Sequence, residues 1–371
     1  MNKWWIAAAR LAALGCLMVS LPLRAEVFHA AFFNPQGVDD PFWKPVTEVM
    51  QAAARQLDIR LDVYAANHDR LRLIEQVRQV VTGADKPDVI LFKNAKQSAG
   101  AILRLAEDNQ VRAFMFNAGL SEEETRDLGR PREKFRYWIG EMLPDDWQAG
   151  HDLAGMLTLA ARERQLVQDG QPIRMLGLGG PPGDRAARAR LDGLQAAVEQ
   201  TPDVRLLQVV PAGWNREEAY RKTLGLLRRY GRVEAIWAAN DPMALGALDA
   251  LQESGYLPGR TVLVGGIDWN PPALAAVREG RLLVTLGGHF LEGGYALVVL
   301  HDYFRGVDFA RRDGVSLKTR LGLLTQENIG RYAERLDGAD WNRIPFRQFS
   351  LVLTPGGERH DFSLDRLLEM L

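Results

Sequence analysis

The sequence predicts an α/β protein in which parallel sheets are covered by helices on both faces. Two observations support this fold class. Short apolar segments of strand length alternate with amphipathic segments of helical period, and there are more of these pairs than one ordinary doubly wound sheet uses. The chain also has 371 residues, of which 47% are hydrophobic, enough for two packed domains. We therefore expect two doubly wound parallel-sheet lobes.

The alternation begins close to the N-terminus. Short apolar runs are typical of buried parallel strands, whereas apolar residues that recur every three or four positions are typical of helices. By these criteria the expected strands cover residues 27–33, 59–66, 88–93, 112–117 and 137–141, and the expected helices cover 41–57, 70–81 and 97–108.

The same pattern resumes in the second half of the chain. Residues 291–304 are strongly apolar, but Glu292, His301 and Asp302 indicate a packed helix and not a membrane span. The remaining expected strands are residues 174–178, 204–211, 235–239, 262–267 and 282–286, with helices at 147–164, 186–200, 217–230, 243–252 and 273–279.

The first 25 residues have the layout of a secretory signal. A short basic start with Lys3 and Arg10 precedes an apolar stretch, and Ala25 follows as a plausible cleavage site. Cys16, the only cysteine, follows a weak lipoprotein-like triplet, so lipidation at Cys16 is the alternative to cleavage after Ala25. Either way, we expect the protein in the periplasm.

Composition and motifs exclude several other classes. The 46 Lys and Arg residues nearly balance 47 Asp and Glu residues, so nothing indicates a nucleic-acid partner. The six histidines form no metal-binding motif, and no nucleophile elbow is present. Two prolines interrupt the glycine-rich segment 177–183, which disfavours a dinucleotide site. We expect no cofactor, no metal and no enzymatic activity.

The most informative segment is residues 235–248, Ala-Ile-Trp-Ala-Ala-Asn-Asp-Pro-Met-Ala-Leu-Gly-Ala-Leu. An apolar strand runs into Asn240 and Asp241, and a helix begins at Pro242, where proline is tolerated. The polar pair thus lies at the carboxyl end of a strand, where open α/β sheets bind ligands. From the local residues alone, a helix cap formed by Asn240 and Asp241 without any ligand is an equally good interpretation.

This segment resembles the Asn-Asp-x-Met-Ala-Leu-Gly-Ala signature of type I periplasmic binding proteins, the family of the ribose- and galactose-binding proteins and the autoinducer-2 receptor. The resemblance implies two lobes joined by three hinge crossings, near Glu141, Gly288 and residues 315–321. The implied division is residues 26–140 plus 289–315 in one lobe and 141–288 plus 316–371 in the other. Residues 326–371 match the family poorly. We expect a strand-like segment at 348–353, a helix from Leu364 and packing along the second lobe.

The resemblance also implies a ligand site at the strand ends. Aromatic side chains would cover the ligand while polar groups bind its hydroxyls. The implied ligand-binding residues are Asn34, Phe42, Trp43, Asn117, Arg190, Trp214, Asn240 and Asp268.

Several of these positions have other interpretations. Phe42 and Trp43 also fit a hydrophobic staple at a helix start, and Trp43 or Trp214 also fits an exposed hinge contact. Arg188 lies close to Arg190 in sequence but on a different helical face. Asp145 and Asp146 fit a helix cap. Trp269, beside Asp268, is expected to narrow the pocket, and Gly287-Gly288-His289 replaces a segment in which relatives often have Gln.

The resemblance implies a monomer that closes on a small sugar-like ligand. The membrane partner would be an inner-membrane ABC permease that takes the ligand up. The alternative is a ligand-sensing subunit that presents its occupancy to a membrane histidine kinase or cyclic-dinucleotide signalling protein.

Overall fold

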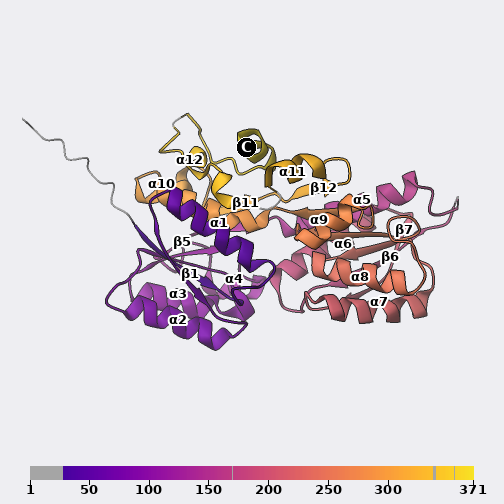
Figure 1. Ribbon diagram of the computed structural model, residues 1–371. Coiled ribbons are helices and arrows are strands. Elements are labelled where there is room, and N and C mark those ends of the chain that lie inside the picture. Colours follow the sequence, from indigo (N-terminus) through magenta and orange to yellow (C-terminus); the bar gives the residue numbers. More distant parts are fainter. Residues whose placement is uncertain (1–27, 169, 337–339, 355) are drawn as a thin grey trace, which may run out of the picture.

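The computed structural model describes residues 28–168, 170–336, 340–354 and 356–371. It contains two α/β lobes, each built on a six-stranded sheet (Figure 1). The predicted fold class is therefore confirmed. The expected signal segment 1–25 and Cys16 lie outside the described residues.

The sheet of the first lobe has the order β11-β5-β4-β3-β1-β2, and its described pairings are all parallel. On one face, α2 and α3 pack against Ala31, Phe33 and Phe92; on the other, α1 and α10 cover Phe32 and Leu91. The elements of this lobe are β1 (His29–Asn34), α1 (Trp43–Gln56), β2 (Arg60–Ala65), α2 (Arg70–Thr82), β3 (Val89–Phe92), α3 (Ala99–Asp108), β4 (Arg112–Phe116), α4 (Glu122–Leu128), β5 (Trp138–Pro144), α10 (Glu292–Phe304) and β11 (Ser316–Thr319).

The sheet of the second lobe has the order β12-β10-β9-β8-β6-β7, in which only β12 is antiparallel to its neighbour among the described pairings. Helix α5 contacts one face through Gly150 and Leu153, and α8 contacts the other through Asp241 and Ala244. Its elements are α5 (Asp146–Glu163), β6 (Ile173–Gly179), α6 (Arg185–Glu199), β7 (Val204–Pro211), α7 (Arg216–Tyr230), β8 (Ala235–Ala238), α8 (Asp241–Glu253), β9 (Leu263–Asp268), α9 (Pro271–Arg278), β10 (Val284–Gly287) and β12 (Gly322–Thr325).

The sheet pairings differ from the expected boundaries between the lobes. Strand β5 remains in the first sheet as far as Pro144, so the chain leaves that lobe after Pro144, three residues beyond Glu141, near which the crossing was expected. Strand β11, expected with the second lobe, pairs with β5 along the edge of the first sheet. The connection of only two residues between β11 and β12 therefore passes from one sheet to the other.

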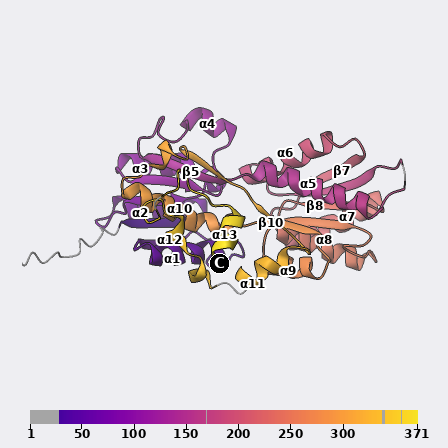
Figure 2. The ribbon, with the colours of Figure 1, turned by 90° about the horizontal axis from the view of Figure 1, so that it is seen from above.

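The C-terminal segment, residues 326–371, contacts both lobes instead of lying along the second one. Helix α11 (Ile329–Leu336) contacts α9, whereas η4 (Trp341–Arg343) and α12 (Phe346–Phe349) contact α1, and α12 also contacts α10. The final helix, α13 (Leu364–Met370), begins where predicted and lies between the lobes (Figure 2). The strand predicted at 348–353 is wrong, because these residues end α12 and continue as a turn.

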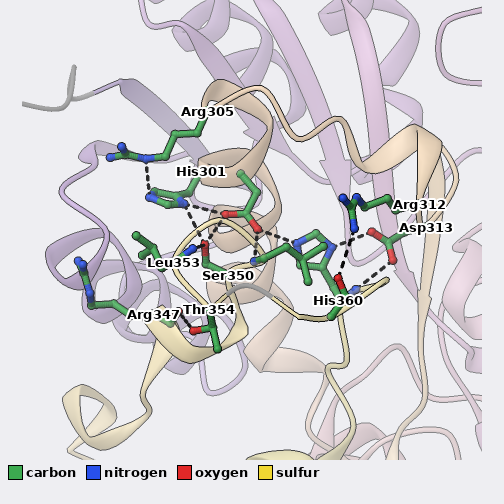
Figure 3. Close-up of polar contacts among 12 residues, drawn as sticks. His301, Arg305, Arg312, Asp313, Arg347, Ser350, Leu353, Thr354 and His360 are labelled. Atoms are coloured by element: carbon green, nitrogen blue, oxygen red, sulfur yellow. Dashed lines mark hydrogen bonds and ion pairs between the residues drawn. The ribbon is translucent and has the colours of Figure 1, made fainter.

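A buried polar cluster fastens this segment to α10 (Figure 3). Arg305 Nε donates to His301 Nε2 at 2.7 Å, and His301 Nδ1 in turn donates to Asp302 Oδ1 at 2.9 Å. Asp302 also accepts from Ser350 Oγ and from His360 Nε2. We call His301, Asp302, Asp313, Ser350 and His360 the tail cluster.

Among the helices of the described residues, none is both long enough and apolar enough to cross a bilayer.

Candidate functional site

A cleft of about 860 Å³ lies between the lobes. Loops that follow β1, β3 and β4 of the first sheet line one side of it, and loops that follow β6, β7, β8 and β9 of the second sheet line the other. Both sheets therefore present the carboxyl ends of their parallel strands to the same space, which is the usual ligand position in such sheets.

Arg190 is the central charged group of the second-lobe side and is only 4% exposed. Its Nε donates to Asp146 Oδ1 at 2.7 Å, and its Nη1 donates to the carbonyl oxygen of Ala239 at 2.7 Å. Nη1 also lies 3.5 Å from Asp268 Oδ1. These contacts hold the guanidinium in one orientation at the cleft.

Close packing of α5 against α6 brings these partners together. A Cβ atom at Gly193 would lie 2.0 Å from the carbonyl oxygen of Trp147, and one at Gly150 would lie 2.0 Å from that of Arg190. Only glycine permits this backbone approach. The approach places Arg190 of α6 beside Asp146 at the start of α5.

Burial dominates the electrostatics of the carboxyl groups here. It raises the pKa of Asp268 well above the usual range and also raises that of Asp146, although Arg190 opposes both shifts. Burial likewise raises the pKa of Asp241 to about 7, against hydrogen bonds from Thr285 and the backbone of Asn270. The cleft therefore presents a guanidinium that is ion-paired with Asp146 and lies beside Asp268, a carboxyl group in which burial favours the neutral form.

Asn240 was expected either to cap a helix or to lie in the ligand site, and its position fits both interpretations. Its Oδ1 accepts from the backbone N–H of Met243 at 3.0 Å, which caps α8, and the residue also lines the cleft. Asp268, the last residue of β9, and Asn117, the residue after β4 in the other lobe, line it too. Their φ angles of 137° and 68° are uncommon for residues with side chains. Such strain is often held at ligand sites.

Two of the predicted aromatic residues lie at the cleft surface. Phe42 lines it and packs on His289, with ring centroids 4.8 Å apart and the rings tilted by 31°. Trp214 also lines it, and the guanidinium carbon of Arg190 lies 5.6 Å from the centre of its ring. Trp43 reaches the cleft but is 3% exposed, because it packs between Phe32 and Phe116. A sandwich of Trp43 and Trp214 around a ligand stays a prediction.

Asn34 and Trp269 differ from the expected arrangement. Asn34 is not among the cleft-lining residues, and its Oδ1 accepts from the backbone N–H of Gln36 at 2.8 Å, so it stabilises the turn after β1. Trp269 does not line the cleft either. Its Nε1 donates to the carbonyl oxygen of Thr285, and its ring packs on Tyr332, so it does not narrow the pocket.

Three important residues were not predicted as part of the site. Asp146 was interpreted as a helix cap, a role that Asp145 alone fills by accepting from the backbone of Gln148.

Lys93, after β3, lies 3.7 Å from Asp184, the N-cap of α6, and this ion pair joins the two lobes. Burial raises the pKa of Asp184, but Lys93 and the backbone N–H of Ala187 outweigh burial and hold this pKa below its usual value. Only the position of Lys93 at a strand end could have suggested this role.

Arg188 was the alternative to Arg190, and the structure separates the two. Arg188 is exposed and pairs with Asp192 on its own helix. No group of three or more His, Cys, Asp or Glu side chains in the described part of the chain is arranged to hold a metal ion.

Two α/β lobes, with a cleft between them lined by strand-end loops, define a hinged ligand-binding protein. Residues 30–306 match the family model described as the periplasmic binding protein domain, and the chain belongs to this family. The members of the family are binding proteins and not enzymes.

Individual relatives agree with this assignment. The chain is 30% identical to the xylitol-binding protein of Mycolicibacterium smegmatis over 288 residues, covering 76% of this chain and 73% of that protein. It is 23% identical to the ribose import binding protein of Haemophilus influenzae, covering 76% and 87%. A periplasmic sugar-binding protein from Pseudomonas fluorescens has a similar crystal structure, with 34% identity, a TM-score of 0.82, and coverage of 92% of this chain and all of that one.

Proposed function

We propose that this protein captures a small, uncharged, polyhydroxylated ligand, a sugar or sugar-like polyol, in the periplasm and delivers it to an ABC permease. The observation that carries the proposal is the cleft itself, where Arg190 of α6 lies with Asn240 and Asp268 at the strand ends of one lobe, opposite Phe42 of the other. Polar groups of this kind bind hydroxyls, and an aromatic ring complements the C–H face of a sugar.

The charge balance of the cleft supports an uncharged ligand. Arg190 is paired with Asp146 and lies near Asp268, while Lys93 is paired with Asp184. A carboxylate ligand would therefore meet cations that already have carboxylate partners, Asp146 and Asp184, and would have to compete with them. The names of the relatives, which include xylitol-binding and sugar-binding proteins, agree with this ligand class.

Closure about the hinge supplies the mechanism that we propose. A ligand that contacts both lobes favours the closed form over the open one, because only the closed form makes both sets of contacts. The closed form would then dock on the permease. We favour uptake over sensing because one of the similar proteins is named an import binding protein. Removal of residues 1–25 as a signal peptide is part of the same proposal.

Two measurements test the proposal. Native mass spectrometry of freshly purified protein is expected to detect a co-purified polyol or sugar. Titration calorimetry should then compare neutral pentitols, pentoses and hexoses with the aldonate of the same carbon number. We expect heat from at least one neutral compound and none from its matched acid; tighter binding of the acid would overturn the ligand class.

A transport assay tests delivery separately. Deletion of the gene is expected to abolish uptake of the identified ligand, labelled with ¹⁴C, and a plasmid copy to restore it. Normal uptake in the deletion strain, together with loss of a transcriptional response to the ligand, would establish the sensing alternative instead.

A further inference from the structure

A second, much smaller cavity lies behind the cleft, where the chain passes from β10 to α10. It has a volume of about 20 Å³. His289, Glu292 and Tyr295 line it from the first-lobe side, and Gly322, Phe362 and Leu364 close it from β12 and the C-terminal segment. His289 also lines the ligand cleft, so one imidazole separates the two spaces.

Three polar atoms of the residues that line this cavity have no hydrogen-bond partner among the described residues. They are His289 Nδ1, Glu292 Oε2 and the hydroxyl oxygen of Tyr295. All three side chains are more than nine-tenths buried. A buried polar group without a partner costs about 1–3 kcal/mol, so three in one place indicate that something binds them.

The size of the cavity selects the ligand. One water molecule requires roughly 10–15 Å³ of probe-occupied volume and typically makes about three hydrogen bonds to buried polar groups. The cavity meets the volume requirement for one water and not for two, and the three side-chain atoms supply the expected number of partners. An organic ligand does not fit.

The hydrogen-bonding roles follow from Arg190. Its Nη2 lies 3.4 Å from His289 Nε2, and a guanidinium can only donate. Asp268 Oδ1 lies 3.5 Å from the same nitrogen, but burial raises the pKa of Asp268 well above its usual value and favours the protonated carboxyl group, which also donates. Nε2 is therefore the accepting nitrogen. Burial and the neighbouring Arg190 lower the pKa of His289 well below its usual value, so the imidazole is neutral. A neutral imidazole that accepts at Nε2 carries its proton on Nδ1, the nitrogen that lacks a protein partner.

We propose that this cavity binds one structural water, which accepts from His289 Nδ1–H and hydrogen-bonds with the Tyr295 hydroxyl and Glu292 Oε2. The water holds His289 in the Nδ1–H tautomer, so that the lone pair of Nε2 accepts from Arg190 Nη2. Glu292 is held in turn by a hydrogen bond from Thr319 Oγ1 to its Oε1. In this arrangement His289 is a positioning residue, which orients the Arg190 guanidinium toward the ligand.

This last step rests on the proposed function, whereas the water and the tautomer do not. The first experiment is therefore made without ligand. A high-resolution crystal structure is expected to show a single peak within about 3.2 Å of all three polar atoms. Absence of the peak, or a peak at the shorter distances of a coordinated cation, overturns the proposal.

The tautomer has its own readout. In ¹⁵N-labelled protein, His289 should show a protonated Nδ1 and an unprotonated Nε2. Tyr295→Phe removes one partner of the water, and Glu292→Leu fills the cavity with an apolar side chain, so both are expected to shift the Nδ1 resonance or mix the two tautomers. Tyr303→Phe, on the same helix but outside the cavity, is the matched control and should leave the resonance unchanged.

If Glu292→Leu does not fold, the wild type and Tyr295→Phe still decide the matter. A protonated Nε2 in the wild type refutes the tautomer. With a neutral polyol identified by calorimetry, Tyr295→Phe is expected to lower affinity by several-fold, and Tyr303→Phe is not. If the wild type binds no polyol but the water and the tautomer are found, the proposed function fails and the water site stands.

Discussion

Two buried polar clusters in this molecule, the tail cluster and the group around His289 at the cleft, both contain histidine and aspartate. They differ in how many of their polar atoms have hydrogen-bond partners. In the tail cluster, both ring nitrogens of His301 and of His360 have partners, and Asp302 accepts four hydrogen bonds. At the cleft, Asp268 lines the ligand space, and His289 has one ring nitrogen, Nδ1, without a hydrogen-bond partner among the described residues. The comparison shows that a fully bonded polar cluster holds segments together, whereas an incompletely bonded one at a cavity is able to bind a ligand.

The largest expected effect tests the structural side of this comparison. Asp302→Ala leaves two histidines and Ser350 without their shared acceptor in a fully buried position. Breaking such a buried pair costs about 3–5 kcal/mol, and urea unfolding monitored by circular dichroism should show a loss of this size. Glu358→Gln, an exposed change in the same segment, is the control. A loss below about 1 kcal/mol would mean that the tail cluster contributes little.

The next effect concerns affinity. Asp268→Ala and Arg190→Ala remove hydrogen-bonding partners of buried ligand hydroxyls and should each weaken binding by about 1.5–3 kcal/mol, roughly tenfold to hundredfold. Titration calorimetry measures this. Arg188→Ala is the matched control, because Arg188 is exposed on the same helix as Arg190. Wild-type affinity in both cleft variants would remove these residues from the site.

The two clusters should also respond differently to pH. Burial lowers the pKa of His360, but Asp302 and Asp313 outweigh it and raise that pKa above its usual value. A raised folded-state pKa contributes stability that is fully present below about pH 6.5 and is lost as the pH rises through the folded value. The free energy of unfolding should therefore fall above neutral pH, and His360→Gln should flatten this dependence.

His289 supplies the contrast to His360. Its folded-state pKa is lowered, so it is neutral in both the folded and unfolded states above neutral pH. His289→Gln is therefore expected to leave the slope of stability against pH unchanged in that range. An equal flattening in both variants would contradict the assignment of this dependence to the tail cluster.

The smallest expected effect is optical. Ligand binding should reduce the radius of gyration in solution scattering and change tryptophan fluorescence. Trp214→Phe should diminish the fluorescence change more than Trp43→Phe, because Trp43 is packed within the first lobe. Binding without a change in scattering would contradict hinge closure, and an undiminished fluorescence change in both variants would contradict the sandwich of the two rings.

Most of the fold could be predicted because buried parallel strands are continuous apolar runs. The exceptions are edge or surface elements. Strand β11 alternates exposed Ser316 and Lys318 with buried residues over four positions, which is too short a pattern to recognise. The apolar run at 348–353 is not a strand because Asp302 accepts from the backbone N–H of Leu351, a contact between residues 49 positions apart.

A site residue could be predicted where its own position in the sequence indicates its role. It could not be predicted where its role depends on an ion pair with a residue far away in the sequence. Arg190, Asn240 and Asp268 follow from the family motif and the strand ends. Asp146 and Lys93 acquire their roles only through Arg190 and Asp184, which lie 44 or more positions away in sequence. Local pattern does not show which distant residues meet, so these partners required the structure.

The path of the C-terminal segment has a consequence for affinity. The chain passes between the lobes after Pro144, at Gly288 and at residues 320–321, and the segment then contacts the first lobe again through η4 and α12. Each added tether removes open arrangements from the unliganded ensemble. Binding then costs less free energy for ordering the lobes. The same ligand contacts therefore give a higher affinity in this protein than they would in a protein whose two lobes moved freely about the hinge.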